Sequence, residues 1–253
     1  MTRYAMAVDL SRCQGCRACV EACKIENNTP SAVFWMYVFR LEQGEYPNTD
    51  ISFLPRPCQH CENPPCVKVC PVGARFKRDD GLVLTDYERC IGCRYCEVAC
   101  PYGVNFFNWR HPEDAFADYD VSFDDPDLEP ITGGAMPPYK NPDHAELQGD
   151  EQRLTSGSAH FKGVMEKCTF CVQRVDQGRM PACVDTCPVG ALQFGDIEDS
   201  ESPISQFVST KKQFKLLEEL GTDPSVIYVG GTPPTHEARE IERPLTGVSH
   251  GNA

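Results

Sequence analysis

The sequence predicts an α+β protein built from two small cysteine-rich modules, and three observations lead to this prediction. All sixteen cysteines of the 253-residue chain fall into four groups of four. Two of the groups share the spacing C-x₂-C-x₂-C-x₃-C. The motif Cys-Pro-Val-Gly-Ala occurs at 70–74 and again at 187–191, with a variant at 100–104. An internal repeat of this kind predicts two similar modules in a pseudo-twofold arrangement.

Each group of cysteines ends in a Cys-x-x-x-Cys step. The groups are Cys13, Cys16, Cys19 and Cys23; Cys58, Cys61, Cys66 and Cys70; Cys90, Cys93, Cys96 and Cys100; and Cys168, Cys171, Cys183 and Cys187. The first and third have the spacing of bacterial ferredoxins, in which the fourth cysteine ligates the other cluster of a pair. Sixteen such thiolates predict four [4Fe–4S] clusters in two bacterial-ferredoxin-like modules, and therefore a protein that conducts electrons.

Two other uses of the cysteines are less compatible with their spacing. Cysteines at i, i+3 and i+6 are badly placed for disulfides, and a chain of this length can bury a core without them. Zinc also binds four thiolates, but usually through two separated C-x₂-C pairs, which only the fourth group partly resembles. A zinc-stabilised scaffold is the alternative, and a colourless purified protein would favour it.

Charge and hydropathy exclude several classes of partner. The formal net charge is −13, and cluster charges add to it, so we expect no nucleic-acid partner. The longest apolar run, 32–39, is far shorter than the ~20 residues of a membrane span. We also expect no signal peptide, because only 4–8 are apolar after Arg3. The sequence has no Ser-His-Asp set, Walker loop or G-x-G-x-x-G motif, so we expect no catalytic residues, molybdopterin, nucleotide or haem in this chain.

The pattern along the chain predicts the following elements before residue 110. They are a strand at 4–10, a helical turn at 19–24, a β-hairpin at 32–42 with its turn at 43–44, and a strand at 81–85. Residues 51–108 hold the second and third groups only twenty residues apart and form one ferredoxin-like module by themselves.

The rest of the chain differs in composition. Residues 111–152 contain twelve acidic residues and one basic residue, Lys140, so we expect 109–159 to be an irregular acidic insertion that either contacts a partner or is simply solvated. Ser202–Pro203 is typical of a helix start, and apolar residues from Ile204 to Leu220 follow helical periodicity up to Gly221. Residues 201–253 are thus expected to form a helix, a strand at 226–229 and a partner-binding tail.

Five stretches of the sequence resemble one protein family. They are 3–10, 58–66, 88–93, 166–171 and 181–187. They are similar to the four-cluster iron–sulfur subunits of membrane-bound molybdopterin oxidoreductases, which include polysulfide, dimethyl sulfoxide, tetrathionate and respiratory arsenate reductases. The iron–sulfur part of alternative complex III is related. The resemblance covers most of 1–110 and 160–200.

The resemblance implies which cysteines share a cluster, a question that spacing alone leaves open. Residues 1–50 and 160–200 would form one module from the first and fourth groups, and 51–108 the other. The implied ligands are Cys13, Cys16, Cys19 and Cys187 for cluster 1; Cys23, Cys168, Cys171 and Cys183 for cluster 2; Cys58, Cys61, Cys66 and Cys100 for cluster 3; and Cys70, Cys90, Cys93 and Cys96 for cluster 4. Every position is cysteine, so no [3Fe–4S] cluster is expected.

The resemblance further implies a non-catalytic subunit of an oxidoreductase complex that is peripheral on the membrane. Single electrons would pass between a molybdopterin-type catalytic subunit at cluster 1 and an integral-membrane, quinone-handling subunit at cluster 4. The direction of flow and the side of the membrane stay open. Two alternatives are a soluble polyferredoxin carrier and an alternative complex III part that passes electrons from quinol to a downstream carrier.

Several basic residues lie close to the cysteines in sequence and are candidates for raising cluster potentials. They are Arg12, Arg17, Arg89, Arg94, Lys167 and Arg174. Surface ion pairs are an equally good interpretation. His60, inside the second group, is either a donor to a cluster sulfur or a packing residue.

Overall fold

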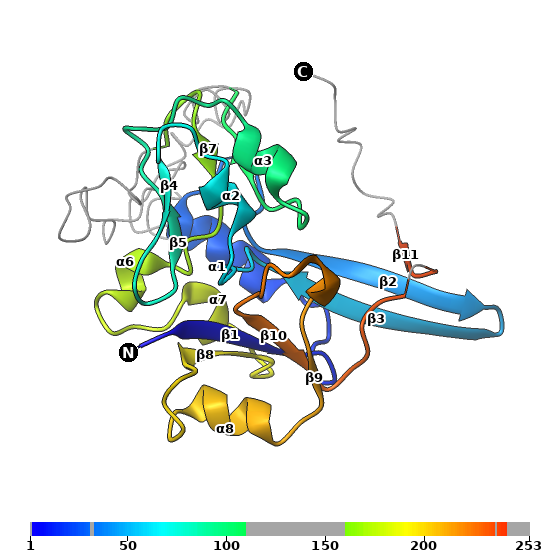
Figure 1. Cartoon of the computed structure of the whole chain (residues 1–253). Helices are drawn as coiled ribbons and strands as arrows, with labels where there is room; N and C mark the ends of the chain where they lie inside the picture. The colour runs from blue at the N-terminus through cyan, green and yellow to red at the C-terminus, as the bar shows by residue number, and fades with distance from the viewer. Residues whose placement is uncertain (1, 31–32, 110–159, 236, 242–253) are drawn as a thin grey trace, which may run out of the picture.

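The computed structural model describes residues 2–30, 33–109, 160–235 and 237–241 (Figure 1). Its central sheet has four strands in the order β8-β1-β10-β9. These are β1 (Tyr4–Asp9), β8 (Leu192–Asp196), β9 (Gln213–Phe214) and β10 (Val226–Val229). β10 pairs with β1 in parallel, whereas β8 pairs with β1 and β9 pairs with β10 antiparallel. The first strand is therefore held on both sides by segments from the last third of the chain.

The two faces of this sheet carry alternate residues of β1 and pack against different layers. Ala5 and Ala7 face α8 (Pro203–Ser209), where they pack with Ile204 and Val208. Met6 and Val8 belong to the main core, which also contains buried cysteines. Figure 1 shows α8 on one side of the sheet and α1 and α7 on the other. The sheet thus separates an apolar layer from a cysteine-rich one.

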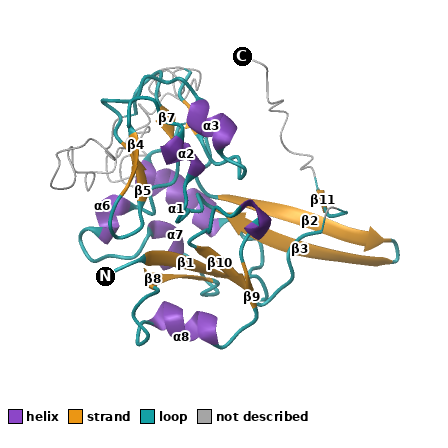
Figure 2. Cartoon of the chain, viewed as in Figure 1, coloured by secondary structure: helices purple, strands orange, loops and turns teal. Residues whose placement is uncertain are grey.

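Short helices carry at least one cysteine of each sequence group and contact one another in pairs (Figure 2). α1 (Ala18–Asn27) contacts α7 (Ala182–Asp185), and α2 (Pro65–Lys68) contacts α3 (Tyr95–Ala99). α2 also contacts β4 (Arg75–Lys77), which pairs with β5 (Val83–Thr85). α6 (Val172–Val175) begins at Cys171. The mixture of strands and few short helices confirms the α+β prediction, as do the strands found within 4–10, 81–85 and 226–229.

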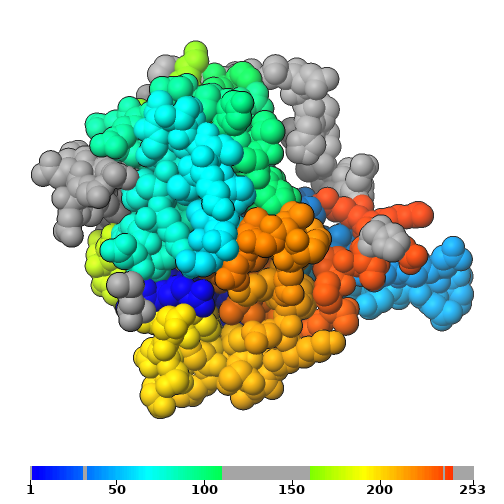
Figure 3. All heavy atoms as spheres, in the orientation of Figure 1, coloured from blue at the N-terminus to red at the C-terminus, as the bar shows by residue number. Residues whose placement is uncertain are grey.

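A long hairpin stands out from the rest of the molecule (Figures 1 and 3). β2 (Tyr37–Glu45) pairs with β3 (Asn48–Arg56), and β11 (Arg239–Glu240) joins the outer edge of β2. The predicted turn at 43–44 is wrong, since those residues pair within the ladder and Tyr46–Pro47 form the loop instead. Proline has no N–H to donate to a ladder, which suits it to the loop.

The predicted C-terminal helix is present but shorter than expected. Ser202 caps it by accepting a hydrogen bond from the backbone N–H of Ser205, and it ends at Ser209. Helical periodicity up to Leu220 was misleading, because Gln213–Phe214 form β9 and the Phe214 ring stacks on Tyr228 with centroids 5.4 Å apart. A short 3₁₀ helix, η1 (Glu218–Leu220), follows. Strand pairing and aromatic stacking override the local pattern here.

A two-stranded pairing lies at the border of the expected acidic insertion. β6 (Phe106–Phe107) pairs with β7 (Met165–Glu166), and Asn108 and Gly163 continue the backbone hydrogen bonding. The insertion at 109–159 lies outside the described residues except for its first residue, and so does the whole tail beyond 241. Within the described ranges, no helix combines the length and apolar character needed to cross a membrane.

Candidate iron–sulfur cluster sites

The fold brings the sixteen cysteines, all of them in the described part of the chain, into four neighbouring sets, and none forms a disulfide. Each set combines cysteines from two of the four sequence groups. The third set, Cys58, Cys61, Cys66 and Cys100, lines one hollow. The fourth set, Cys70, Cys90, Cys93 and Cys96, lines another. Each hollow is thus faced by four thiols, which is the donor set of one cluster.

The first and second sets are identified from the cysteines whose charges raise one another's pKa values. Burial raises the pKa of Cys19 to about 12, and the charges of Cys13, Cys187 and Cys16 add to the rise. These four cysteines are the first set. The second set is Cys23, Cys168, Cys171 and Cys183. Burial raises the pKa of Cys183 well above its ordinary value, with further contributions from Cys171, Cys23 and Cys168.

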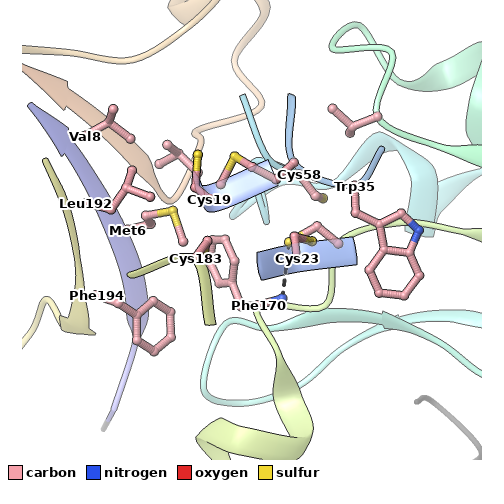
Figure 4. Packing of buried hydrophobic residues seen from close by; sticks show 14 of the residues in the cluster. Met6, Val8, Cys19, Cys23, Trp35, Cys58, Phe170, Cys183, Leu192 and Phe194 are labelled. Carbon is pink, nitrogen blue, oxygen red and sulfur yellow. Dashed lines mark hydrogen bonds between the residues drawn. The ribbon is translucent and has the colours of Figure 1, made fainter. Parts of the chain in front are cut away.

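The second set lies in the middle of the main core. Figure 4 shows Cys23 and Cys183 among apolar side chains that include Met6, Phe170 and Leu192. Burial raises the pKa values of Cys168 and Cys171 to about 12 and about 11. Such thiols give up their protons only to a group that compensates the buried charge, and iron does so. The donors are therefore soft sulfur ligands suited to iron–sulfur chemistry.

Backbone N–H groups point at cysteine sulfurs in several sets. The N–H of Arg75 lies 3.4 Å from Cys70 Sγ, and that of Ala191 lies 3.3 Å from Cys187 Sγ. Arg75 directly follows the Cys-Pro-Val-Gly-Ala motif at 70–74, and Ala191 is the last residue of the same motif at 187–191. Because hydrogen bonds to sulfur stabilise added negative charge, such contacts tune cluster potentials.

Two side chains that sequence reasoning missed also donate to sulfur. Asn27 Nδ2 lies 3.5 Å from Cys23 Sγ and 3.6 Å from Cys171 Sγ. Arg75 Nη2 lies 3.6 Å from Cys96 Sγ. The Nε and Nη1 atoms of Arg75 are buried without an acceptor among the described residues. Buried donors of this kind fit a neighbouring group that is rich in sulfur acceptors. Cys23 lies only four residues before Asn27, whereas Cys171 lies 144 residues from Asn27 and Cys96 lies 21 residues from Arg75, and these two contacts have no signal in the local sequence.

The four sets differ in their exposure to solvent. Cys16 of the first set and Cys93 of the fourth are exposed, whereas all of the second set and most of the third are buried. Burial and the other cysteines of the second set make the largest contributions to the raised pKa of Cys183, and Cys19 of the first set makes a smaller one. The first two sets are therefore adjacent. After burial, the charge of Cys58 is the largest contribution to the raised pKa of Cys168, which links the second and third sets.

Most of the predicted basic residues form ion pairs with carboxylates. Arg12 pairs with Asp9, Arg89 with Asp86, Arg94 with Glu97, and Arg174 with Glu26 and Asp185. The surface ion-pair interpretation is confirmed for the exposed side chains of Arg12, Arg89 and Arg94, whereas the pair of Arg174 with Glu26 is largely buried. Arg17 lies over the ring of Tyr37 and donates weakly to the Val38 carbonyl. Only Lys167 is buried, and its Nζ donates to the carbonyl oxygens of Val83 and Cys168.

His60 has a packing role and does not contact sulfur. Its Nδ1 accepts a hydrogen bond from the N–H of Val83 at 3.0 Å, so the proton resides on Nε2, which donates to the Cys168 carbonyl at 3.0 Å. The ring stacks on Phe170 with centroids 3.8 Å apart. Burial, followed by the charge of Lys167, lowers the pKa of His60 well below its ordinary value, so the ring is neutral.

Comparison with known proteins agrees with this geometry. Two family models described as 4Fe-4S dicluster domains match residues 49–118 with 157–197, and residues 12–74. A Halobacterium salinarum protein named as a candidate iron–sulfur subunit of dimethyl sulfoxide reductase is 40% identical over 91% of this chain and 80% of its own length.

Two further relatives cover the chain to a similar extent. The arsenate respiratory reductase iron–sulfur subunit of a Shewanella species is 39% identical over 90% of this chain and 96% of its own. The menaquinone reductase iron–sulfur cluster-binding subunit of Nitratidesulfovibrio vulgaris is 36% identical over 90% and 88%. Together with sixteen cysteines in two dicluster domains, these matches show that the chain holds four [4Fe–4S] clusters and belongs to the family of iron–sulfur electron-transfer subunits of molybdopterin-type oxidoreductases.

Proposed function

We propose that this chain carries single electrons along a line of four clusters, from a catalytic subunit at the first cysteine set to a membrane-embedded, quinone-handling subunit at the fourth, or in reverse. The observation that carries the proposal is the position of the sets. The two sets with exposed cysteines are the two ends of the line, and the buried sets lie between them. Electrons can therefore enter and leave at the surface while the intermediate sites stay shielded from solvent.

Each set holds one cluster in this proposal. The ligands are Cys13, Cys16, Cys19 and Cys187; Cys23, Cys168, Cys171 and Cys183; Cys58, Cys61, Cys66 and Cys100; and Cys70, Cys90, Cys93 and Cys96. The hollows of the third and fourth sets and the mutual electrostatics of the first and second support this assignment. The clusters supply the one-electron chemistry, and the chain supplies thiolates, hydrogen bonds and burial.

The same contacts support two pseudo-equivalent modules. The pair α1 and α7 comes from residues 1–50 and 160–200, and the pair α2 and α3 comes from 51–108. The N–H contacts to Cys70 and Cys187 from the end of the repeated motif, at Arg75 and Ala191, support a pseudo-twofold relationship between the modules.

The surface at the fourth set supports a largely apolar partner. Val72 and Ile91 line the hollow of this set and are exposed, Ile91 by 64%. Tyr95 and Val98 stand one helical turn apart on α3, and Val98 is 87% exposed. Exposed apolar side chains that gather around one site are typical of an interface. A relative named as a menaquinone reductase subunit supports quinone as the chemistry at this end, and the chain would then be peripheral on the membrane.

Substitutions in this surface test the proposal. Tyr95→Asp combined with Val98→Asp should release the chain from the membrane fraction of its native host and leave its iron content unchanged, because both side chains are exposed, by 62% and 87%. The control is Ile25→Asp, because Ile25 is also 62% exposed but lies on α1, the helix of Cys19 and Cys23. Retention of the double variant on the membrane, at a level equal to the control, would overturn the assignment of this face.

A further inference from the structure

One buried cation in this chain has cysteine sulfurs in place of a carboxylate partner. Arg75, the first residue of β4, is 2% exposed. Its Nη2 donates to Asn105 Oδ1 at 2.7 Å and lies 3.6 Å from Cys96 Sγ. Within the described residues, it forms no ion pair with an acidic side chain. An arginine is charged at every working pH, so its burial requires a compensating negative charge nearby.

The compensating charge comes from two cysteine sets at once. Arg75 lines the hollow of the fourth set, and Asn105, which accepts its hydrogen bond, lines the hollow of the third. In addition, α2, which carries Cys66 of the third set, contacts β4, which begins at Arg75. The guanidinium therefore lies between the last two sites of the line.

We propose that Arg75 is a positioning residue shared by the third and fourth clusters and that it raises the reduction potential of both. The inference rests on the ligand sets proposed above. When a cluster accepts one electron, no bond is formed or broken, and its net charge becomes more negative by one. A fixed cation in a poorly solvated interior stabilises that extra charge more than an exposed cation can.

The position of Arg75 gives it a second effect on the relay. Because one cation faces both clusters, an electron stays close to the same positive charge as it moves between them. Arg75 therefore changes the difference between the two potentials little, and both clusters are made better acceptors than they would be without it. Arg89 and Arg94 are closer to cysteines in sequence, but carboxylates pair with them at the surface.

The test is an anaerobic redox titration of the holoprotein, followed by electron paramagnetic resonance, on Arg75→Gln and a control. In Arg75→Gln, the equilibrium constant for reducing the third and fourth clusters should fall by about tenfold, or about 59 mV for one electron. The first and second clusters should keep their potentials. The control is Arg89→Gln, which removes the same charge beside Cys90 from an exposed, paired side chain. It should change no potential appreciably.

A second variant keeps the inference testable if Arg75→Gln does not assemble. Asn105→Asp places a carboxylate of nearly the same shape against Arg75 Nη2 and neutralises the guanidinium without removing it. It should lower the same two potentials, whereas Arg75→Lys should keep them close to those of the wild type. Either of two results would overturn the role of Arg75. In the first, the third and fourth clusters keep their potentials in a fully loaded Arg75→Gln or Asn105→Asp variant. In the second, the potentials of all four clusters shift equally. A wild-type protein with well under about sixteen irons would instead contradict the ligand sets.

Discussion

His160 and Glu166 form a buried ion pair, with Nδ1 of the histidine 2.7 Å from Oε1 of the glutamate. The other ring nitrogen, Nε2, donates to the Asn27 carbonyl at 2.9 Å. Because both nitrogens face acceptors, the ring is held as an imidazolium. Burial acts to lower the pKa of His160, but the charge of Glu166 and these hydrogen bonds outweigh it, and the pKa is raised. The pair ties the end of α1 to β7.

The ion pair makes part of the stability depend on pH. Since the pKa of His160 is raised in the folded protein, its contribution is fully present below the ordinary histidine pKa of about 6.5 and is lost as pH rises through the raised value. His160→Gln should lower the free energy of unfolding by about 3 kcal/mol at pH 6 and by less at pH 9. Anaerobic thermal unfolding, followed by cluster absorbance, measures this. An equal loss at both pH values would contradict it.

Gly92, in the loop of the third cysteine group, lies directly against Gly163 and Phe107, where there is no room for a side chain. Its φ is +68°, and an added Cβ would lie 2.1 Å from the Gly163 carbonyl oxygen and 2.9 Å from the Phe107 ring. Gly92→Ala should therefore destabilise the protein by about 3 kcal/mol or more. Gly73 is the matched control, because its φ is +63° but nothing lies within 4 Å of an added Cβ. Gly73→Ala should lose only about 1 kcal/mol. Similar melting temperatures for the two variants would refute this explanation.

Asn27 should raise the potential of the second cluster. Asn27→Leu removes the Nδ2 donor that faces Cys23 and Cys171 and keeps the side-chain volume similar. Loss of two hydrogen bonds to sulfur should lower the equilibrium constant for reduction of this cluster by about tenfold. Redox titration measures the change. Asn63→Leu, which removes a surface bond to the Gly221 carbonyl, is the control and should leave all four potentials as they are. If both variants titrate alike, Asn27 has no such role.

Cysteine substitutions test how the fourth sequence group is divided between two clusters. Cys183 and Cys187 are four residues apart but belong to the second and first sets. Cys183→Ala should abolish the same paramagnetic signal as Cys171→Ala, and Cys187→Ala the same signal as Cys16→Ala. Each variant should lose about four irons. The finding that Cys183→Ala and Cys187→Ala abolish one common signal would contradict the division.

Local patterns were enough to predict several elements and the nature of the cofactor. The strands near 4–10 and 226–229 are short apolar runs, and both are buried within one sheet. The cysteine spacing indicated cubane clusters because a loop with ligands at i, i+3 and i+6 can surround one corner of a cluster. These signals are contained in a few neighbouring residues, so no tertiary information is needed to read them.

Features that depend on distant contacts were not predictable in the same way. Helical periodicity continued past Ser209, but pairing of Phe214 with β10 decided the structure there. Asn27 meets Cys171 across 144 positions, and Arg75 meets Cys96 across 21. Spacing alone also left open which groups share a cluster. In each case, the deciding partner is brought near only by the complete fold.

The pairing of β1 determines how late in synthesis the central sheet can be completed. β1 begins at Tyr4, yet its two neighbours in the sheet are β8, at 192–196, and β10, at 226–229. A nascent chain that leaves the ribosome therefore cannot complete the central sheet until β10 has emerged, although residues 51–108 can already have come together. The strand that leads into the first cysteine group therefore gains its second neighbour in the sheet only when nearly the whole polypeptide has been released.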